Sequence, residues 1–119
     1  MAVPPFALVG VGGAVGAVLR HAVGELVPPG RFRLGTVTVN VAGTFALAAL
    51  TFAGAGDPAM LALGTGACGA FTTFSSFSID AVELYETDGP AFAAVYAVGT
   101  LLAAGAALGL AWLAVRGLP

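Results

Sequence analysis

The chain has 119 residues, of which 59% are hydrophobic and only 8% are charged. A soluble domain usually carries about a quarter charged residues, so this composition excludes an ordinary water-soluble protein and indicates a single domain that resides in lipid. The net charge is −2 and arginine supplies all four basic residues, which excludes a basic surface for nucleic acid.

Four apolar stretches follow one another along the chain. A helix needs about 20 mostly apolar residues to cross roughly 30 Å of hydrocarbon. The stretches cover residues 5–27, 34–54, 59–79 and 91–115, with breaks at Pro28-Pro29-Gly30, Gly56-Asp57-Pro58 and Gly89-Pro90. They lack the alternation of polar and apolar residues that is typical of membrane strands. We therefore predict an all-α membrane protein, in which residues 1–119 form one domain of four transmembrane helices.

The first span carries glycines at helical spacing and a basic residue near its end. Gly12 and Gly16 lie four residues apart, as do Gly105 and Gly109 in the fourth span. Helices in lipid associate closely through small residues at this spacing, so packing is the simplest role for these glycines. Arg20 can extend its side chain to the membrane interface or pair with an acid.

The arginines do not fix the direction of insertion. Arg116 falls on one side of the predicted bundle, and Arg31 and Arg33 fall on the other. A difference of about one arginine is too small for the positive-inside rule to select an orientation. Insertion in both directions, and hence an antiparallel homodimer, is a hypothesis that this balance allows.

The second span places Thr36 and Asn40 four residues apart on one helical face. An unpaired amide at membrane depth is costly. Asn40 therefore either makes a hydrogen bond to another helix or lines a polar path, and the sequence leaves both interpretations open.

The third span holds small residues followed by two threonines, in the run Gly64-Thr-Gly-Ala-Cys-Gly-Ala-Phe-Thr-Thr73. We predict that the helix is broken here in mid-membrane. Backbone broken at that depth must face protein, water or an ion, and its freed carbonyls can bind a cation. The alternative is a flexible helix in which threonine hydroxyls bond to the preceding turn.

Aromatic and hydroxyl side chains alternate after the threonines. Phe74 and Phe77 share one helical face and are interleaved with Ser75, Ser76 and Ser78. The positive edges of aromatic rings can favour a small anion, and hydroxyl donors can replace part of its hydration shell. Lipid-facing or core phenylalanines are the alternative. The acids that follow are interpreted as a solvated rim: Asp80, Glu83, Glu86 and Asp88.

The fourth span again places two polar residues, Tyr96 and Thr100, four apart on one face. Together with Thr36 and Asn40 they could form a polar track across the bundle. Hydrogen bonds between helices are the alternative role.

Three motifs, one in each of the first three spans, together resemble the Fluc/CrcB family of fluoride channels, and the resemblance extends over all four spans in order. The specific one is the third, and the motifs are Gly12-Gly13-Ala-Val-Gly16-Ala-Val-Leu-Arg20, Gly35-Thr36-Val-Thr-Val-Asn40-Val-Ala-Gly43 and Gly69-Ala-Phe-Thr72-Thr73-Phe74-Ser75-Ser76-Phe77-Ser78. The chain departs from the family pattern at Ala70, where a second glycine is frequent, and at Asp80, where glutamate is common.

The resemblance implies an antiparallel, dual-topology homodimer with two fluoride pores, although some members pair with a paralogous chain. It also implies one structural sodium ion, not transported, which the backbone carbonyls of Gly69 and Thr72 would hold. Phe74 and Phe77 would face the anion, and Arg20 would lie near the pore entrance. The remaining pore residues would form a polar track: Asn40, Thr36, Ser75, Ser78, Tyr96 and Thr100.

The function implied is passive export of fluoride across the cell membrane, which lowers cytoplasmic fluoride and protects against its toxicity. The alternative is an exporter of the small multidrug-resistance type, which exchanges protons for cations. Such an exporter needs a carboxylate within its first span, and the only acid in that region is Glu25, close to the end of the span. No serine–histidine–acid set is apparent, so we do not expect an enzyme.

Overall fold

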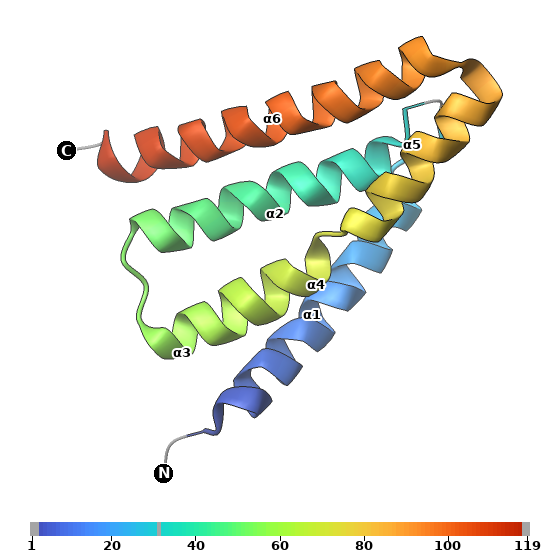
Figure 1. Cartoon of the computed structure of the whole chain (residues 1–119). Helices are drawn as coiled ribbons and strands as arrows, with labels where there is room; N and C mark the ends of the chain where they lie inside the picture. The colour runs from blue at the N-terminus through green and yellow to red at the C-terminus, as the bar shows by residue number, and fades with distance from the viewer. Residues whose placement is uncertain (1–2, 31, 118–119) are drawn as a thin grey trace.

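The computed structural model describes residues 3–30 and 32–117, and these residues fold into helices joined by short links (Figure 1). In chain order the elements are α1 (Pro5–Leu26), α2 (Leu34–Phe52), α3 (Asp57–Ala59), the π-helix η1 (Met60–Cys68), α4 (Gly69–Phe71), α5 (Phe74–Asp88) and α6 (Pro90–Arg116). Arg31, one of the arginines considered for the direction of membrane insertion, lies outside the described residues.

Three of the described helices, α1, α2 and α6, are long and apolar enough to cross a membrane. They begin and end within two residues of the predicted spans at 5–27, 34–54 and 91–115. The remaining span, predicted at 59–79, is divided among α3, η1, α4 and the first part of α5. The all-helical membrane fold is therefore confirmed, and the third pass is its irregular part.

Proline and glycine fix the helix ends. Pro5, Pro58 and Pro90 stand in the first turns of α1, α3 and α6, where the missing amide of proline costs no helical hydrogen bond. Gly54 and Gly89 follow α2 and α5 with φ of 72° and 95°. Glycine adopts this left-handed region without the steric penalty of other residues, so both positions turn the chain back sharply.

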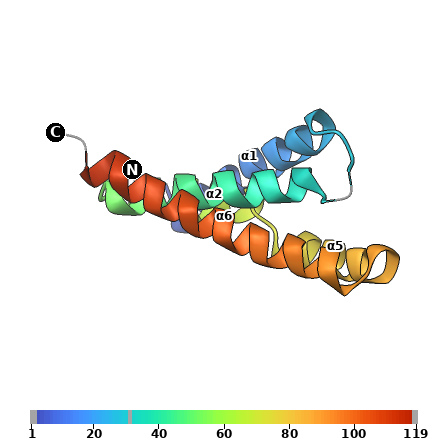
Figure 2. The same cartoon turned by 90° about the horizontal axis from the view of Figure 1, so that it is seen from above.

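The helices run back and forth along one direction (Figures 1 and 2). α2 packs along α6, α1 packs against η1 and α4, and α5 packs against the first part of α6. The start of α1, the link from α2 to α3 and the end of α6 lie on one side of the molecule. The links from α1 to α2 and from α5 to α6 lie on the other side.

Glycines allow the backbones of α1 and η1 to touch. A Cβ atom at Gly12 would overlap the carbonyl oxygen of Ala62, and one at Gly16 would overlap that of Ala67. From the other helix, a Cβ at Gly66 would lie 2.7 Å from Val9 O. The predicted close packing through Gly12 and Gly16 is thus confirmed. Gly105 and Gly109 have nothing within 4 Å of an added Cβ in the single chain.

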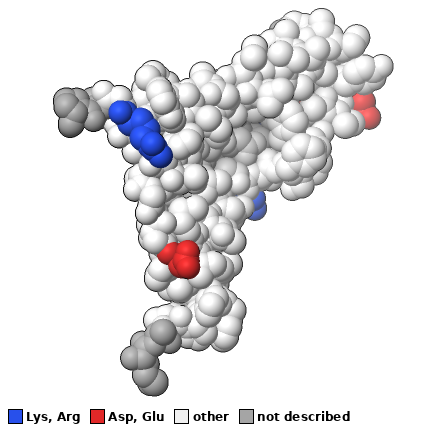
Figure 3. Space-filling model, turned by 60° about the vertical axis from the view of Figure 1, so that its left-hand side comes forward, with Lys and Arg blue, Asp and Glu red and all other residues white. Residues whose placement is uncertain are grey.

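The single chain leaves most of its apolar side chains exposed. Its buried hydrophobic residues are mostly small, and Leu84 is the largest side chain below 2% exposure. Large apolar side chains are exposed along every long helix, among them Val11, Leu63, Leu101 and Leu113. On the face in Figure 3, charged side chains form only small, separate patches. Such a surface fits lipid and further protein.

Candidate functional site

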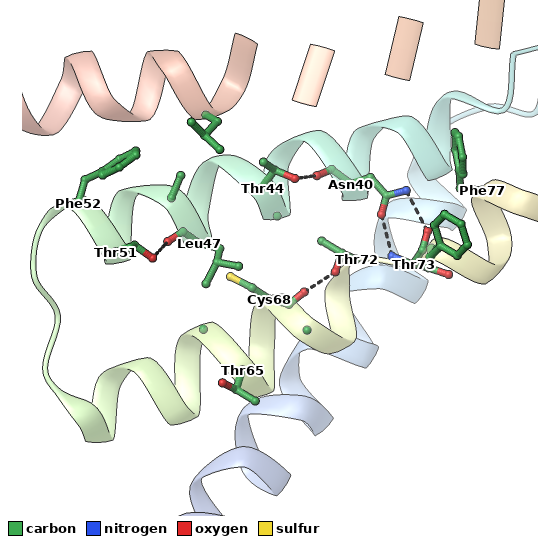
Figure 4. A pocket seen from close by; sticks show the side chains of 16 residues that line it. Asn40, Thr44, Leu47, Thr51, Phe52, Thr65, Cys68, Thr72, Thr73 and Phe77 are labelled. Carbon is green, nitrogen blue, oxygen red and sulfur yellow. Dashed lines mark hydrogen bonds between the residues drawn. The ribbon is translucent and has the colours of Figure 1, made fainter. Parts of the chain in front are cut away.

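The candidate site is built on a two-residue interruption between α4 and α5. Thr72 and Thr73 leave helical geometry, with φ/ψ of −83°/159° and −152°/118°. The side-chain amide of Asn40, on α2, bonds to both the backbone N–H and the backbone carbonyl of Thr73. Thr73 N donates to Asn40 Oδ1 at 2.7 Å, and Asn40 Nδ2 donates to Thr73 O at 3.0 Å (Figure 4). One side chain thereby satisfies both polar groups of an extended residue, which would otherwise be costly to bury.

The interruption diverts two backbone amides from their helical acceptors. In a continuous α-helix the amide of Thr73 would bond to Gly69 O, and that of Ser76 would bond to Thr72 O. The Thr73 amide instead donates to Asn40, and the Ser76 amide donates to Thr73 Oγ1 at 3.1 Å. Thr73 thus caps α5, a role that suits threonine. The carbonyls of Gly69 and Thr72 are released from these two helical bonds.

Three aromatic rings continue from the interruption towards α6. The ring centroids of Phe74 and Phe77 lie 5.9 Å apart, and Phe77 stacks on Tyr96 at 5.4 Å. Phe77 is half-buried, whereas Phe74 is 80% exposed in the single chain. The three rings come from two helices, α5 and α6.

A cavity of about 750 Å³ lies beside the interruption, between α2, η1 and the start of α5 (Figure 4). Asn40, Thr72 and Thr73 line it together with Phe74 and Phe77. Neutral side chains provide the rest of the lining: Thr44, Leu47, Ala48, Thr51, Phe52, Thr65, Cys68 and Leu108, with Gly43, Gly64 and Gly69. The cavity therefore combines apolar walls with a few hydroxyl and amide groups.

Asp80 lies at the centre of a second polar cluster. Thr36 Oγ1 donates to Asp80 Oδ2 at 2.7 Å, and the Tyr96 hydroxyl donates to the same oxygen at 3.2 Å. The Asp80 side chain is only 15% exposed. Its interpretation as a solvated rim acid was therefore wrong, because the turn of α5 directs it between α2 and α6. Glu83 and Glu86 are exposed, as a rim requires.

A smaller cavity of about 450 Å³ opens next to this cluster. Arg20 of α1 and Arg33, the residue before α2, line it together with Thr36, Asp80 and Ser76. Thr73 lines this cavity as well as the larger one. The two cavities therefore adjoin at the interruption. Arg20, the predicted entrance residue, lines the smaller cavity.

The predicted polar track is divided into separate groups. Thr36 and Tyr96 meet through Asp80, whereas among the described residues the side chain of Asn40 bonds only to Thr73. Thr100 is buried on α6, and its hydroxyl has no hydrogen-bond partner in the described part of the chain.

The predicted serines take different positions on α5. Ser75 is exposed, with its hydroxyl 3.3 Å from Thr73 Oγ1. Ser78 is half-buried one turn further along.

Sequence reasoning missed the roles of Thr73, Asp80 and Arg33. Asp80 lies three residues after Phe77, which placed it on the same face as the aromatic residues. That spacing could have distinguished Asp80 from the exposed acids Glu83 and Glu86. The pairing of Asn40 with Thr73 joins residues 33 positions apart, and no local pattern predicts such a contact.

The fold and the site define a multi-pass helical membrane protein with two cavities beside an interrupted helix. Within this class the chain belongs to the CrcB family. The family model described as "CrcB-like protein, Camphor Resistance (CrcB)" matches residues 7–114. The family resemblance stated from the motifs is thereby confirmed, and the chain is an integral protein of the cell membrane.

The relatives are named as ion channels. A protein of Halobacterium salinarum named "Fluoride-specific ion channel FluC 1" is 57% identical over 112 residues, which cover 94% of each chain. A "Fluoride-specific ion channel FluC 2" of Haloarcula marismortui is 53% identical over 92% of each chain. A relative from Thermotoga maritima with the name "Fluoride-specific ion channel FluC" is 43% identical over 76% of this chain and 78% of its own. These names agree with the expectation that the chain is not an enzyme.

Proposed function

We propose that this protein is a fluoride-selective channel that lets cytoplasmic fluoride leave the cell passively. The names of its relatives support this function. The structural observation that carries it is the interruption at Thr72 and Thr73, which opens directly onto Phe74 and Phe77. Export of this kind lowers cytoplasmic fluoride and protects the cell from its toxicity.

The chemistry of the larger cavity suits a small, strongly hydrated anion. The residues that line it are neutral throughout the described chain, so no fixed cation would trap fluoride in transit. The Asn40 amide donates one of its two Nδ2 hydrogens to Thr73 O, so the other hydrogen can replace part of the hydration shell. The edges of Phe74 and Phe77 add weak positive potential. The unpartnered hydroxyl of Thr100 supports a further polar position on the path.

The released carbonyls fit the expected structural sodium ion. Gly69 and Thr72 both line the larger cavity, and the amides that would occupy their oxygens in a helix bond elsewhere. Unwound carbonyls of this kind are the usual ligands for sodium in membrane proteins. Two oxygens from one chain are too few for a buried cation, and a second copy would supply two more. The ion would join two chains and would not be transported.

A second copy also accounts for the exposed part of the site. Phe74 is exposed, and Leu108 is the only described residue of α6 that lines the larger cavity. An antiparallel homodimer in the membrane, with the interrupted helix at mid-depth, would cover this part of the site and bury the exposed phenylalanine. We therefore propose this assembly, with two pores per dimer.

The test is ion efflux from liposomes that contain only this protein. We expect rapid fluoride release without a proton gradient, and little chloride release under the same conditions. Phe74→Ile and Phe77→Ile should each slow fluoride release by about tenfold or more, because a branched aliphatic side chain lacks the positive ring edge. Size-exclusion chromatography in detergent controls for assembly.

Three results would contradict the proposal. Absence of fluoride release from the unaltered protein would exclude the channel, and proton-driven uptake of a quaternary ammonium cation would favour the exporter instead. Undiminished release from both phenylalanine variants would exclude the assigned path.

A further inference from the structure

We propose that Arg33 is the counterion that keeps the mouth of the fluoride path from becoming negatively charged. This inference rests on the proposed function, and it adds a positioning residue that sets the charge of the smaller cavity. Arg33 would act on fluoride through Asp80 and Glu83 rather than by binding the ion.

The contacts of Arg33 connect it to two acids of α5, Asp80 and Glu83. Its Nη2 lies 2.8 Å from Glu83 Oε2, and its Nε lies 3.9 Å from Asp80 Oδ1. The other oxygen of Asp80 accepts the hydroxyls of Thr36 and Tyr96. Arg33 therefore faces the side of the Asp80 carboxylate that these hydroxyls leave free.

The backbone of Arg33 has an unusual conformation. Its φ of 50° and ψ of 54° are left-handed, and no other non-glycine residue in the described chain has a positive φ. This conformation is unfavourable for a residue with a side chain, and it persists where surrounding contacts hold it. The two ion pairs with α5 are contacts of this kind. The turn before α2 thus carries arginine where glycine would fit more easily.

The charge balance of the cavity depends on this residue. Arg20 and Arg33 line the cavity with Asp80, and Glu83 stands next to it, so two positive charges balance two negative ones. Removal of Arg33 would leave an excess negative charge in the smaller cavity, which Thr73 also lines. A negative mouth repels an approaching anion and lowers its local concentration. The Arg33 side chain is 38% exposed, so this effect should weaken as salt screens it.

The experiment compares fluoride efflux from liposomes at low and high concentrations of an impermeant salt. Arg33→Gln should slow efflux about tenfold at low salt, because steering of this kind changes encounter rates by factors of 10 or more, and the deficit should shrink at high salt. Arg116→Gln is the matched control. Its Nε donates to Phe52 O at the other end of α2, so Arg116→Gln removes the same charge away from the smaller cavity and should leave the salt dependence of efflux unchanged.

A second variant tests the same charge balance in the opposite direction. Glu83 is half-exposed, and Glu83→Gln should raise efflux at low salt by about twofold, since it leaves the mouth with excess positive charge. This variant decides the matter if Arg33→Gln does not assemble. Salt-independent loss of efflux in Arg33→Gln, or unaltered efflux in either variant, would overturn the role of Arg33. Absence of efflux from the unaltered protein would instead overturn the proposed channel.

Discussion

Asn40 shows how a single side chain can stabilise a non-helical backbone inside a membrane protein. Its amide offers one acceptor and one donor, and both are used by the amide group and the carbonyl of Thr73. The complementarity is specific to asparagine at this distance, since a carboxylate offers only acceptors. Asn40 therefore holds the non-helical backbone at Thr73 in place.

The first prediction concerns this pair. Asn40→Asp should place a carboxylate oxygen against the carbonyl of Thr73 and lower the free energy of unfolding by about 1–3 kcal/mol, the usual cost of an unsatisfied buried polar group. Thermal unfolding in detergent would measure this loss. Thr38→Val is the control, because Thr38 is exposed on the same helix and its hydroxyl bonds only to Leu34 O. Equal stability of the two variants would contradict the structural role of Asn40.

At the scale of the helices, α1 and η1 depend on glycine for contact. Gly12 and Gly16 bring α1 against the backbone of residues 62–67. The contact coincides with the π-helix, whose wider turn is rare and occurs mostly at functional sites. Close backbone approach takes the place of the hydrophobic effect as the attraction between helices in lipid. The position of the interruption at Thr72 thus depends on how η1 sits against α1.

The second prediction tests this packing. Gly16→Val should separate α1 from η1 and abolish the assembled, conducting protein, because its side chain would overlap the Ala67 carbonyl. Gly10→Ala is the matched control on the same helix, since nothing lies within 4 Å of a Cβ there. Alanine at this position should stabilise the helix by up to about 1 kcal/mol. Chromatography in detergent and fluoride efflux would report both variants, and normal assembly of Gly16→Val would contradict the packing.

The sequence predicted the three regular helices well because their signals are local. Apolar length and the prolines near 28 and 90 define α1, α2 and α6 to within two residues. The structure of the third predicted span, residues 59–79, was harder to predict from the sequence. Its small residues around Gly66 form η1, and the chain leaves helical geometry only at Thr72. The partners of Thr73 and Asp80 come from α2 and α6, so they depend on how the helices rotate against one another.

At the scale of the whole molecule, the proposed dimer accounts for what one chain leaves uncovered. The larger cavity is open, and apolar side chains cover most of the surface. The start of α1 and the end of α6 lie on one side of the molecule, and the described arginines are divided between the two sides, with Arg20 and Arg33 on one and Arg116 on the other. Such a charge distribution gives the insertion machinery little basis for choosing an orientation. An antiparallel dimer requires that both orientations occur.

The third prediction follows from this balance. Ala53→Lys with Gly56→Lys adds two positive charges to the side that holds the end of α6. Glu86→Lys with Thr87→Lys adds two positive charges and removes one negative charge on the opposite side. All four positions are exposed. Added lysines in short loops direct their side of the protein to the cytoplasm. Each double variant should therefore insert in one orientation only, and opposite orientations should result from the two variants.

If the working unit is antiparallel, neither double variant alone should protect cells against fluoride, and expression of both together should restore protection. Labelling of a cysteine placed at each terminus would verify the orientations. Two control double variants carry glutamine in place of lysine at the same positions. They control for damage to the loops, because they add no lysine, and each should protect cells by itself. Full protection by either fixed-orientation variant alone would show that a parallel arrangement suffices. The second copy would then have to close the path beside Phe74 in some other way.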